Sequence, residues 1–224
     1  MQSYEIEIKS LLGSKENADA LLSRMRTLDP NTKQIGSSKQ LNHYFIDGSL
    51  ERLLEGVKDL LSPQSQARFA DLASKAKEFS VRTRDKDGKV MLVVKASVDD
   101  TTSANGISRI EFEEVVPLTL AELDERLLAS GFVYQAKWSR AREEYECNGA
   151  TICLDKNAGY GYVAEFEKVV DDASVVESVR DELRALMQRV GAQELPQERL
   201  ERMFAHYNAN WPEYYGTEKI FLIE

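Results

Sequence analysis

The chain has 224 residues, of which 42% are hydrophobic, and it carries a formal net charge of −9 with a pI of about 5.0. This length supports one good core, or one domain with an insertion. No basic arm or stripe offsets the acidic excess, which argues against a protein that binds nucleic acid or an anionic membrane. A small anionic substrate is still compatible with this charge, because a local basic lining can coexist with an acidic exterior.

The start of the chain and its cysteines predict a cytoplasmic protein. Charges interrupt the first apolar stretch, so we expect no signal peptide, and no apolar run approaches the roughly 18 residues of a membrane helix. The two cysteines, Cys147 and Cys153, form no spaced framework and flank a turn out of register with each other. We therefore expect free, reduced thiols.

Hydrophobic periodicity predicts alternating strands and helices in the first half of the chain. The expected elements are a strand at 4–9, a helix at 14–28, a strand at 40–46, a helical hairpin at 49–78, and strands at 79–85 and 89–96. Asp87 and Gly88 form a strong hairpin signal between the last two strands. The 49–78 hairpin is expected to pack helix on helix, with a contact in a homodimer as the alternative.

The second half of the chain continues this alternation. The expected elements are a strand at 107–116, a helix at 119–130, strands at 135–147, 150–155 and 162–170, and helices at 174–191 and 196–207. The turn and cap signals are Asn148-Gly149 for a hairpin, and the pairs Thr119/Glu122 and Ser174/Glu177 for capping boxes. We expect one α+β domain over 1–224 with mostly antiparallel strands, a helical insertion at 49–78 and a helical, aromatic C-terminal extension at 192–224.

Charged side chains alternate with apolar ones along several of these strands, so each charged set lies on one face of its sheet. The sets are Glu5, Glu7 and Lys9; Arg82 and Arg84; Arg109, Glu111 and Glu113; Arg140 and Arg142; and Glu165 and Glu167. For any single strand, the usual interpretation is the solvent-exposed face of an amphipathic sheet. These sets, however, contain almost no Ser, Thr, Asn or Gln, and several are pure pairs of carboxylates or of arginines.

Pure pairs of like charge favour a ligand-binding interior over a solvated surface. Carboxylates two residues apart on one face lie roughly 7 Å apart and repel each other unless a cation lies between them. Paired arginines recognise phosphate oxygens through several planar hydrogen bonds. We therefore predict a closed antiparallel β-barrel, or tunnel, with a charged interior and with helices packed against its apolar outer face.

The order of these motifs resembles the CYTH family, the triphosphate tunnel metalloenzymes that include class IV adenylyl cyclases, thiamine triphosphatases and inorganic tripolyphosphatases. Glu5-Ile6-Glu7-Ile8-Lys9 resembles the family's ExExK signature, which is weak by itself because such strings are common. The later matches are the second strand at 43–47, the RxR strand at 82–84 with Lys95, the RxExE strand at 109–113, the K/RxRxxY segment at 140–145, and the LD…G…ExE close formed by 154–155, Gly159, Gly161 and 165–167. The resemblance covers residues 4–190. The long 49–78 stretch and the 192–224 tail depart from it, and either could cap the tunnel or alter which substrate enters.

The resemblance implies a metal and substrate site built from these residues. Its metal ligands would be Glu5, Glu7, Asp155, Glu165 and Glu167, with Glu111 and Glu113 nearby, around one or two Mg²⁺ or Mn²⁺ ions. Its substrate-binding residues would be Lys9, Arg82, Arg84, Lys95, Arg109, Lys137, Arg140 and Arg142, of which Lys9, Arg82, Arg84 and Lys95 are also assigned to catalysis. A surface position is an equally good interpretation of Lys137. The oxygen ligands, and the lack of Cys/His pairs at metal spacing, argue against zinc.

The expected function is metal-dependent hydrolysis of a triphosphate, with inorganic tripolyphosphate preferred because no plain base-recognition element stands out. A class IV adenylyl cyclase that converts ATP to cyclic AMP and pyrophosphate, and a thiamine triphosphatase, are the alternatives within the family. A non-catalytic polyphosphate- or nucleotide-binding module is the alternative outside the enzymes, and the full carboxylate set argues against it. His43 and His206 are expected to be packing or surface residues, and Trp138 to pack rather than to stack on a substrate ring.

Overall fold

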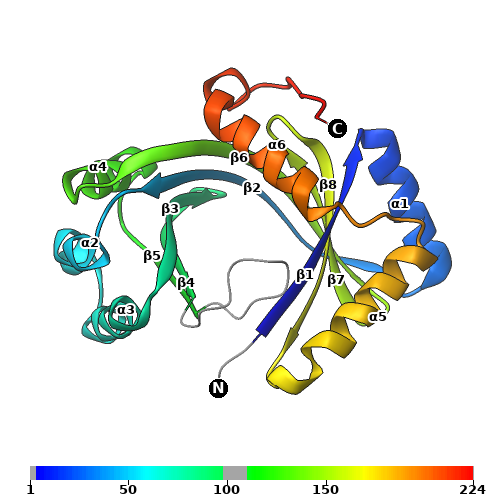
Figure 1. Ribbon diagram of the computed structural model, residues 1–224, viewed down its shortest axis with the longest axis horizontal. Helices are drawn as coiled ribbons and strands as arrows, with labels where there is room; N and C mark the ends of the chain where they lie inside the picture. Colours follow the sequence, from blue (N-terminus) through cyan, green and yellow to red (C-terminus); the bar gives the residue numbers. More distant parts are fainter. Residues whose placement is uncertain (1–3, 98–109, 224) are drawn as a thin grey trace. The chain divides into compact units, whose positions relative to one another are not determined.

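A computed structural model describes residues 4–97 and 110–223 (Figure 1). Eight strands form one antiparallel sheet in the order β1-β8-β7-β6-β2-β3-β4-β5. The strands are β1 Tyr4–Gly13, β2 Lys33–Ile46, β3 Glu78–Lys86, β4 Lys89–Ser97, β5 Ile110–Val115, β6 Val133–Cys147, β7 Ala150–Asn157 and β8 Gly161–Val170. The helices are α1 Lys15–Leu28, α2 Leu50–Val57, α3 Pro63–Lys75, α4 Leu120–Ala129, α5 Val176–Arg189 and α6 Gln197–Asn210.

The described chain divides into two compact units. Unit 1 comprises the described residues within Met1–Lys39 and Ser139–Glu224, and unit 2 those within Gln40–Thr102 and Arg109–Trp138. The long strands β2 and β6 run through both units. Each unit has its own apolar core on one face of its strands.

Unit 1 covers one face of its strands with helices α1 and α5. Ile6 and Ile8 of β1 are each 1% exposed, and they share an apolar core with Leu21 of α1 and Leu183 of α5. Because strand side chains alternate between the two faces, the charged residues of β1 lie on the face opposite these helices. The prediction that the ExExK charges point away from the helices is confirmed.

Unit 2 covers one face of its strands with α4 and with the helices of the 49–78 insertion. Leu53 of α2 and Phe69 of α3 are fully buried in the core of this unit. Phe69 stacks on Phe112 of β5, with 4.9 Å between ring centroids, and Ser65 of α3 donates a hydrogen bond to Glu114 of β5 at 2.8 Å. The predicted packing of helix on helix is confirmed, and the insertion also forms part of the cover of the sheet.

The strand order begins with β1 and ends with β5, so the described strands form an open sheet. The predicted closure into a barrel is therefore not confirmed. Alternation along a strand reveals which side chains share a face. Closure depends on the tilt and stagger of the strands, which that pattern does not encode.

The turn and cap signals are confirmed at three positions and wrong at one. Both hairpin turns have consecutive residues with positive φ, at Asp87 and Gly88 and at Asn148 and Gly149, and α4 carries the predicted capping box. Helix α5, by contrast, begins after a short 3₁₀ turn at Ala173–Val175, with Val175 as its N-cap and no side-chain cap bond. The Ser174 N–H donates to the carboxylate of Asp172 at 2.8 Å, so the polar signal belongs to this turn and the helix starts later.

The C-terminal extension packs on unit 1. The backbone N–H of Leu195 donates to the carbonyl of Lys9 at 2.7 Å, and that of Phe221 to the carbonyl of Gly159 at 2.8 Å. Tyr207 of α6 stacks on Tyr160, with 5.9 Å between ring centroids. The aromatic residues of the tail therefore cover the turn between β7 and β8.

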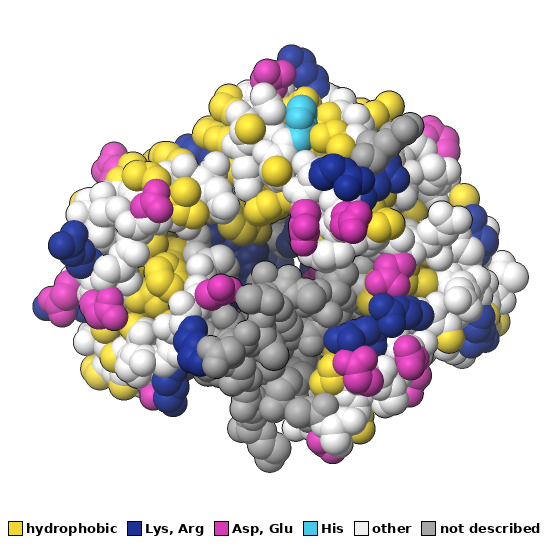
Figure 2. All heavy atoms as spheres, viewed as in Figure 1, with side chains coloured by type: hydrophobic (Ala, Val, Ile, Leu, Met, Phe, Trp, Pro, Cys, Tyr) yellow, Lys and Arg dark blue, Asp and Glu magenta, His cyan; other side chains and the backbone are white. Residues whose placement is uncertain are grey.

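None of the described helices is long and apolar enough to cross a membrane. Both cysteines are free, as predicted, and both are buried. Acidic and basic side chains are interspersed among hydrophobic ones over the face seen in Figure 2.

Candidate active site

Three carboxylates of unit 1 form a group that suits a divalent cation. Glu5 and Glu7 lie on β1, and Glu167 of β8 is directly opposite Glu7 in the antiparallel register. One carboxylate oxygen from each lies within 4.8 Å of the others, and this is the only such group of three or more that the described residues form. Carboxylate oxygens are the ligands that Mg²⁺ and Mn²⁺ prefer, so the donor set fits either ion.

The electrostatics of Glu167 point to the same conclusion. Burial raises the pKa of Glu167 to about 7, and the negative charge of the nearby Glu5 adds to this rise. The charge of Arg142 opposes the rise without cancelling it. A nearby cation favours the charged form of a carboxyl group, so a metal ion would ionise Glu167 fully.

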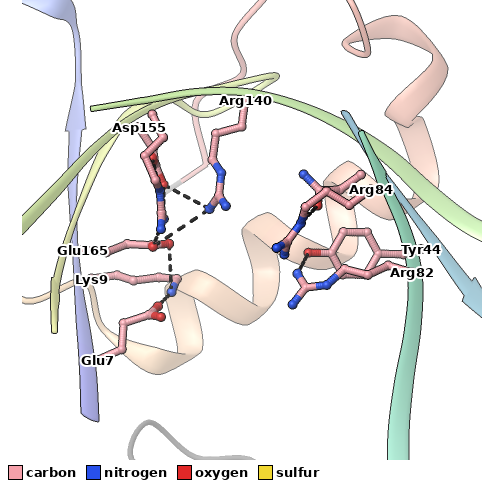
Figure 3. A network of polar contacts seen from close by, with 10 residues as sticks. Glu7, Lys9, Tyr44, Arg82, Arg84, Arg140, Asp155 and Glu165 are labelled. Atoms are coloured by element: carbon pink, nitrogen blue, oxygen red, sulfur yellow. Dashed lines mark hydrogen bonds and ion pairs between the residues drawn. The ribbon is translucent and has the colours of Figure 1, made fainter. Parts of the chain in front are cut away.

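A second group of unit 1 pairs buried carboxylates with basic residues (Figure 3). Asp155 of β7 is fully buried and Glu165 of β8 is 6% exposed. Arg142 of β6 contacts Asp155 through two hydrogen bonds of 2.8 and 2.7 Å, and it also donates to Glu165. Arg140 reaches Asp155 at 3.2 Å, and Lys9 lies 3.2 Å from Glu165 and also contacts Glu7.

This network favours the ionised forms of Glu165 and Arg142, whereas burial raises the pKa of Asp155 despite its hydrogen bonds from Arg142 and Arg140. Burial alone would raise the pKa of Glu165, but Lys9, Arg142 and Arg140 outweigh it and hold the pKa at about 2. Burial alone would lower the pKa of Arg142, but its bonds to Asp155 and the charge of Glu165 raise it. Three basic residues, Lys9, Arg140 and Arg142, thus face three carboxylates, Glu7, Asp155 and Glu165, so the network places basic donors within a locally balanced set of charges.

Asp155 and Glu165 were predicted as metal ligands, and in this structure they accept hydrogen bonds from basic residues instead. Their sequence pattern does not distinguish these roles, because a carboxylate beside arginines and a carboxylate beside a metal look alike along a strand. A direct role for them at the metal stays a prediction.

Unit 2 holds the predicted arginine pair on the face of β3 opposite its buried residues Val81 and Thr83 (Figure 3). Arg82 donates from Nη1 to the hydroxyl of Tyr44 at 2.8 Å, and its guanidinium lies 5.3 Å from the centroid of the Tyr44 ring. Arg84 donates from Nε to the amide oxygen of Asn42 at 2.9 Å and from Nη1 to Glu113 at 3.1 Å.

The remaining predicted residues of unit 2 fall into three cases. Lys95 of β4 is opposite Glu111 of β5, with 3.3 Å between the ammonium and a carboxylate oxygen. Lys137 lies 4.2 Å from the ring centroid of Tyr134, so a phosphate contact by Lys137 stays a prediction. Arg109 lies outside the described residues.

Sequence reasoning missed the two partners of the arginines, Asn42 and Tyr44. They alternate on β2 and are directly opposite Arg84 and Arg82 in the register. The signal was present, since a polar residue and an aromatic one share one face of a strand. Assigning it required the pairing of β2 with β3, which the sequence alone does not establish.

A buried polar cluster was also missed. Asp124 of α4 is 3% exposed and accepts hydrogen bonds from His43 Nδ1 at 2.6 Å, from the Thr83 hydroxyl at 2.6 Å and from the Tyr134 hydroxyl at 2.7 Å. His43 is therefore a buried packing residue, as expected. Its carboxylate partner lies on a helix far along the chain, so no local pattern predicted the contact.

Taken unit by unit, these groups define a class of protein: antiparallel strands with helices on their apolar face and charged side chains on the other, with carboxylates suited to a metal in unit 1 and arginines suited to phosphate in unit 2. Residues 3–199 match the CYTH domain family. The chain therefore belongs to the CYTH family, whose members are metal-dependent enzymes that act on triphosphates.

Solved structures show the same fold at low sequence identity. The PH1819 protein from Pyrococcus horikoshii is 19% identical, with a TM-score of 0.61 over 91% of this chain and 99% of that one. A candidate adenylate cyclase from Vibrio parahaemolyticus is 16% identical, with a TM-score of 0.57 over 90% of this chain and 99% of that one. The protein HpAC1 from Hippeastrum, described as a candidate adenylyl cyclase with a dominant triphosphatase activity, is 20% identical, with a TM-score of 0.52 over 92% of this chain and 96% of that one. Among curated protein sequences, none matches this chain.

Proposed function

We propose that the chain is a metal-dependent triphosphatase that prefers inorganic tripolyphosphate. Water adds to a terminal phosphorus, the phosphoanhydride bond breaks, and the products are orthophosphate and pyrophosphate. The observation that carries this proposal is the group of Glu5, Glu7 and Glu167, whose oxygens converge within 4.8 Å. Such a group needs a cation before it can admit a polyanion.

The residues of unit 1 would divide the work of binding between them. The three carboxylates would hold Mg²⁺ or Mn²⁺, and the bound ion would neutralise charge on the phosphoryl oxygens. Lys9, Arg140 and Arg142 would donate hydrogen bonds to the phosphate oxygens. Asp155 and Glu165 hold these basic side chains in place through contacts of 2.7–3.2 Å, so little ordering would remain to be done when substrate binds.

The arginines of unit 2 would add phosphate contacts, whose strength would not depend on the organic part of the substrate. Arg82 and Arg84 offer planar donors, which match phosphate geometry. The aromatic ring beside them, Tyr44, already lies under the guanidinium of Arg82, so it is poorly placed to stack on a base. This arrangement favours tripolyphosphate over ATP or thiamine triphosphate, and hydrolysis over cyclisation, because a cyclase must hold adenine and ribose firmly. The dominant triphosphatase activity described for the Hippeastrum protein agrees with this choice.

The test is incubation of the protein with tripolyphosphate, ATP or thiamine triphosphate in Mg²⁺ or Mn²⁺, followed by chromatography of the products. We expect tripolyphosphate to be consumed fastest and any turnover of ATP to release orthophosphate. Formation of cyclic AMP faster than phosphate release would make the protein a cyclase. Tight binding of tripolyphosphate with no turnover under any metal would make it a binding module.

A further inference from the structure

Strand β2 presents one partner to each arginine of the RxR strand. In the antiparallel register of β2 and β3, Tyr44 is opposite Arg82 and Asn42 is opposite Arg84. Side chains that are directly opposite in this way lie on the same face of the sheet and close enough to touch. All four residues belong to unit 2.

Tyr44 restrains Arg82 through two different contacts. Its hydroxyl accepts a hydrogen bond from Nη1 at 2.8 Å, and its ring lies 5.3 Å from the guanidinium carbon, within the range of a cation–π interaction. The hydrogen bond holds the Nη1 end of the guanidinium, and the contact with the ring adds a second restraint. Both contacts come from a neutral side chain, so they leave the positive charge of Arg82 uncompensated.

The opposite edge of the Arg82 guanidinium is left for a ligand. The Nε atom is buried and has no hydrogen-bond partner among the described residues. A buried donor without a partner is costly, and a ligand oxygen would relieve that cost. Because Tyr44 occupies Nη1, an anion would meet the edge formed by Nε and Nη2, which can bind two oxygens of one phosphate side by side.

Arg84 is held in a different way. Asn42 accepts a hydrogen bond from its Nε at 2.9 Å, and Glu113 accepts one from its Nη1 at 3.1 Å. Glu113 offsets the charge of Arg84, whereas Tyr44 does not offset that of Arg82. The two arginines are therefore unequal, and Arg82 should be the stronger anion ligand.

We infer that Tyr44 is a positioning residue for Arg82, and Asn42 for Arg84, and that together they set the affinity for the phosphate chain. Arginine has a long side chain whose ordering opposes binding, and fixing it beforehand reduces that entropic cost. This assignment deepens the proposed function and rests on it, since it presumes that the ligand is a polyphosphate.

The experiment compares Tyr44→Phe, which removes only the hydroxyl, with Tyr44→Leu, which also removes the ring. We expect the KM for tripolyphosphate to rise roughly five- to tenfold in Tyr44→Phe and further in Tyr44→Leu, with kcat changed by less than about threefold. The Kd for tripolyphosphate, measured by calorimetry, should rise by the same factors. Tyr145→Phe is the matched control: it loses a hydroxyl bonded to Glu143 at 2.8 Å, in the core of unit 1, and should leave KM unchanged.

A double-mutant cycle separates positioning from general packing. In an Arg82→Ala background, Tyr44→Phe should have no further effect on Kd, because the group that it positions is gone. Equal effects of Tyr44→Phe in both backgrounds, or wild-type Kd in Tyr44→Phe, would overturn the assignment. If the wild-type protein binds tripolyphosphate without cleaving it, the proposed hydrolysis is overturned and the positioning roles of Tyr44 and Asn42 are not. If the wild-type protein does not bind tripolyphosphate at all, the proposed hydrolysis and the positioning roles are both overturned.

Discussion

At the residue scale, the charged face of the strands holds two kinds of carboxylate with opposite properties. Glu165 and Glu167 are two residues apart on β8, yet the pKa of Glu165 is held at about 2 and that of Glu167 is raised to about 7. The difference comes from their neighbours, because Glu165 lies among basic side chains whereas Glu167 lies beside Glu5. Glu165 belongs to the network with Lys9, Arg140 and Arg142, and Glu167 belongs to the carboxylate group with Glu5 and Glu7.

This contrast predicts an unusual response of Glu167→Gln. The substitution removes a carboxyl group from a like-charged cluster, so the metal-free protein should become more stable, with a Tm a few degrees higher. The rise in Tm that excess Mg²⁺ gives to the wild-type protein should shrink strongly, because a ligand has been lost. Thermal unfolding with and without Mg²⁺ measures both effects.

The matched control for that experiment is Glu146→Gln, which alters an exposed carboxylate paired with Lys33. It should keep the wild-type response to Mg²⁺. A full response to Mg²⁺ in Glu167→Gln would remove this residue from the metal group.

The arginines of β3 yield a prediction about specificity. Arg82→Ala and Arg84→Ala should each cost about 1.5–3 kcal/mol of substrate binding, since a charged hydrogen bond to phosphate is lost. The resulting rise in KM should be similar for tripolyphosphate, ATP and thiamine triphosphate, because the ligand proposed for these residues is the phosphate chain that all three share. Steady-state kinetics with the three substrates measures it, and a loss confined to one substrate would show that the arginines read its organic part.

The identity of these arginines was predictable from the sequence, but their surroundings were not. Alternation placed Arg82 and Arg84 on one face of a strand, and the order of motifs assigned that face to phosphate. The roles of Tyr44 and Asn42 depend on which residue of β2 is opposite which residue of β3. That register is set by long-range pairing, so a local pattern cannot reveal it.

At the element scale, Asp124 joins helix α4 to the strands that carry the arginine pair. Burial alone would raise the pKa of Asp124, but hydrogen bonds from His43, Thr83 and Tyr134 outweigh it and hold the pKa below its ordinary value of 3.8. The ionised form is therefore favoured by folding. Its contribution to stability is present above about pH 4 and is lost as the pH falls through the lowered pKa.

Asp124→Asn should therefore be less stable than the wild-type protein at pH 7, by about 1–3 kcal/mol, because it breaks a buried network of three hydrogen bonds. The gap should narrow as the pH falls below 4, where the wild-type carboxylate also becomes protonated. Urea unfolding of both proteins between pH 7 and pH 3 measures the gap. A constant gap over this range would show that the charge of Asp124 does not contribute.

The start of β8 depends on a glycine for two separate reasons. Gly161 has a φ of +71°, and a Cβ atom there would lie 2.2 Å from the carbonyl oxygen of Gly13, which is backbone and cannot move aside easily. Gly149 has nearly the same φ, +73°, but a Cβ atom there would meet nothing within 4 Å. Comparing substitutions at the two positions therefore separates the free-energy cost of a positive φ from the cost of a steric clash with the backbone of Gly13.

Gly149→Ala should lower the free energy of unfolding by about 1–2 kcal/mol, the cost of a left-handed conformation alone. Gly161→Ala should lower it by clearly more, because β1 and β8 must also move apart. Chemical denaturation of the two variants makes the comparison. Equal losses would show that the backbone at Gly13 gives way without cost.

The elements themselves were largely predictable, and the errors lie at their ends. Hairpin turns at Asp87-Gly88 and Asn148-Gly149 and the cap at Thr119 depend on adjacent residues, so they are encoded locally. The predicted start of α5 was wrong because the Asp172 carboxylate accepts a hydrogen bond from the backbone of Ser174 and a 3₁₀ turn precedes the helix. Closure of the sheet could not be predicted, since it depends on the geometry of all strands together.

At the scale of the whole molecule, the acidic chain should depend on a divalent ion for turnover. Excess chelator should abolish hydrolysis of tripolyphosphate, and added Mg²⁺ or Mn²⁺ should restore it, because the group of Glu5, Glu7 and Glu167 repels a polyanion when no cation is present. The rate of phosphate release, measured before and after the metal is returned, is the readout. Undiminished turnover in excess chelator would exclude the metal from the mechanism.

The helical insertion has a consequence for how such a chain can change over time. Helices α2 and α3 cover the apolar side of the unit 2 strands, while Arg82 and Arg84 project from the other side of the same strands. Segments inserted on the covered side can change in length or sequence, and so alter the stability of the fold, without contacting the proposed ligand. Substitutions on the charged side would alter ligand binding and leave the apolar packing unchanged. Stability and ligand binding could therefore evolve separately in related proteins, because they depend on opposite faces of the same strands.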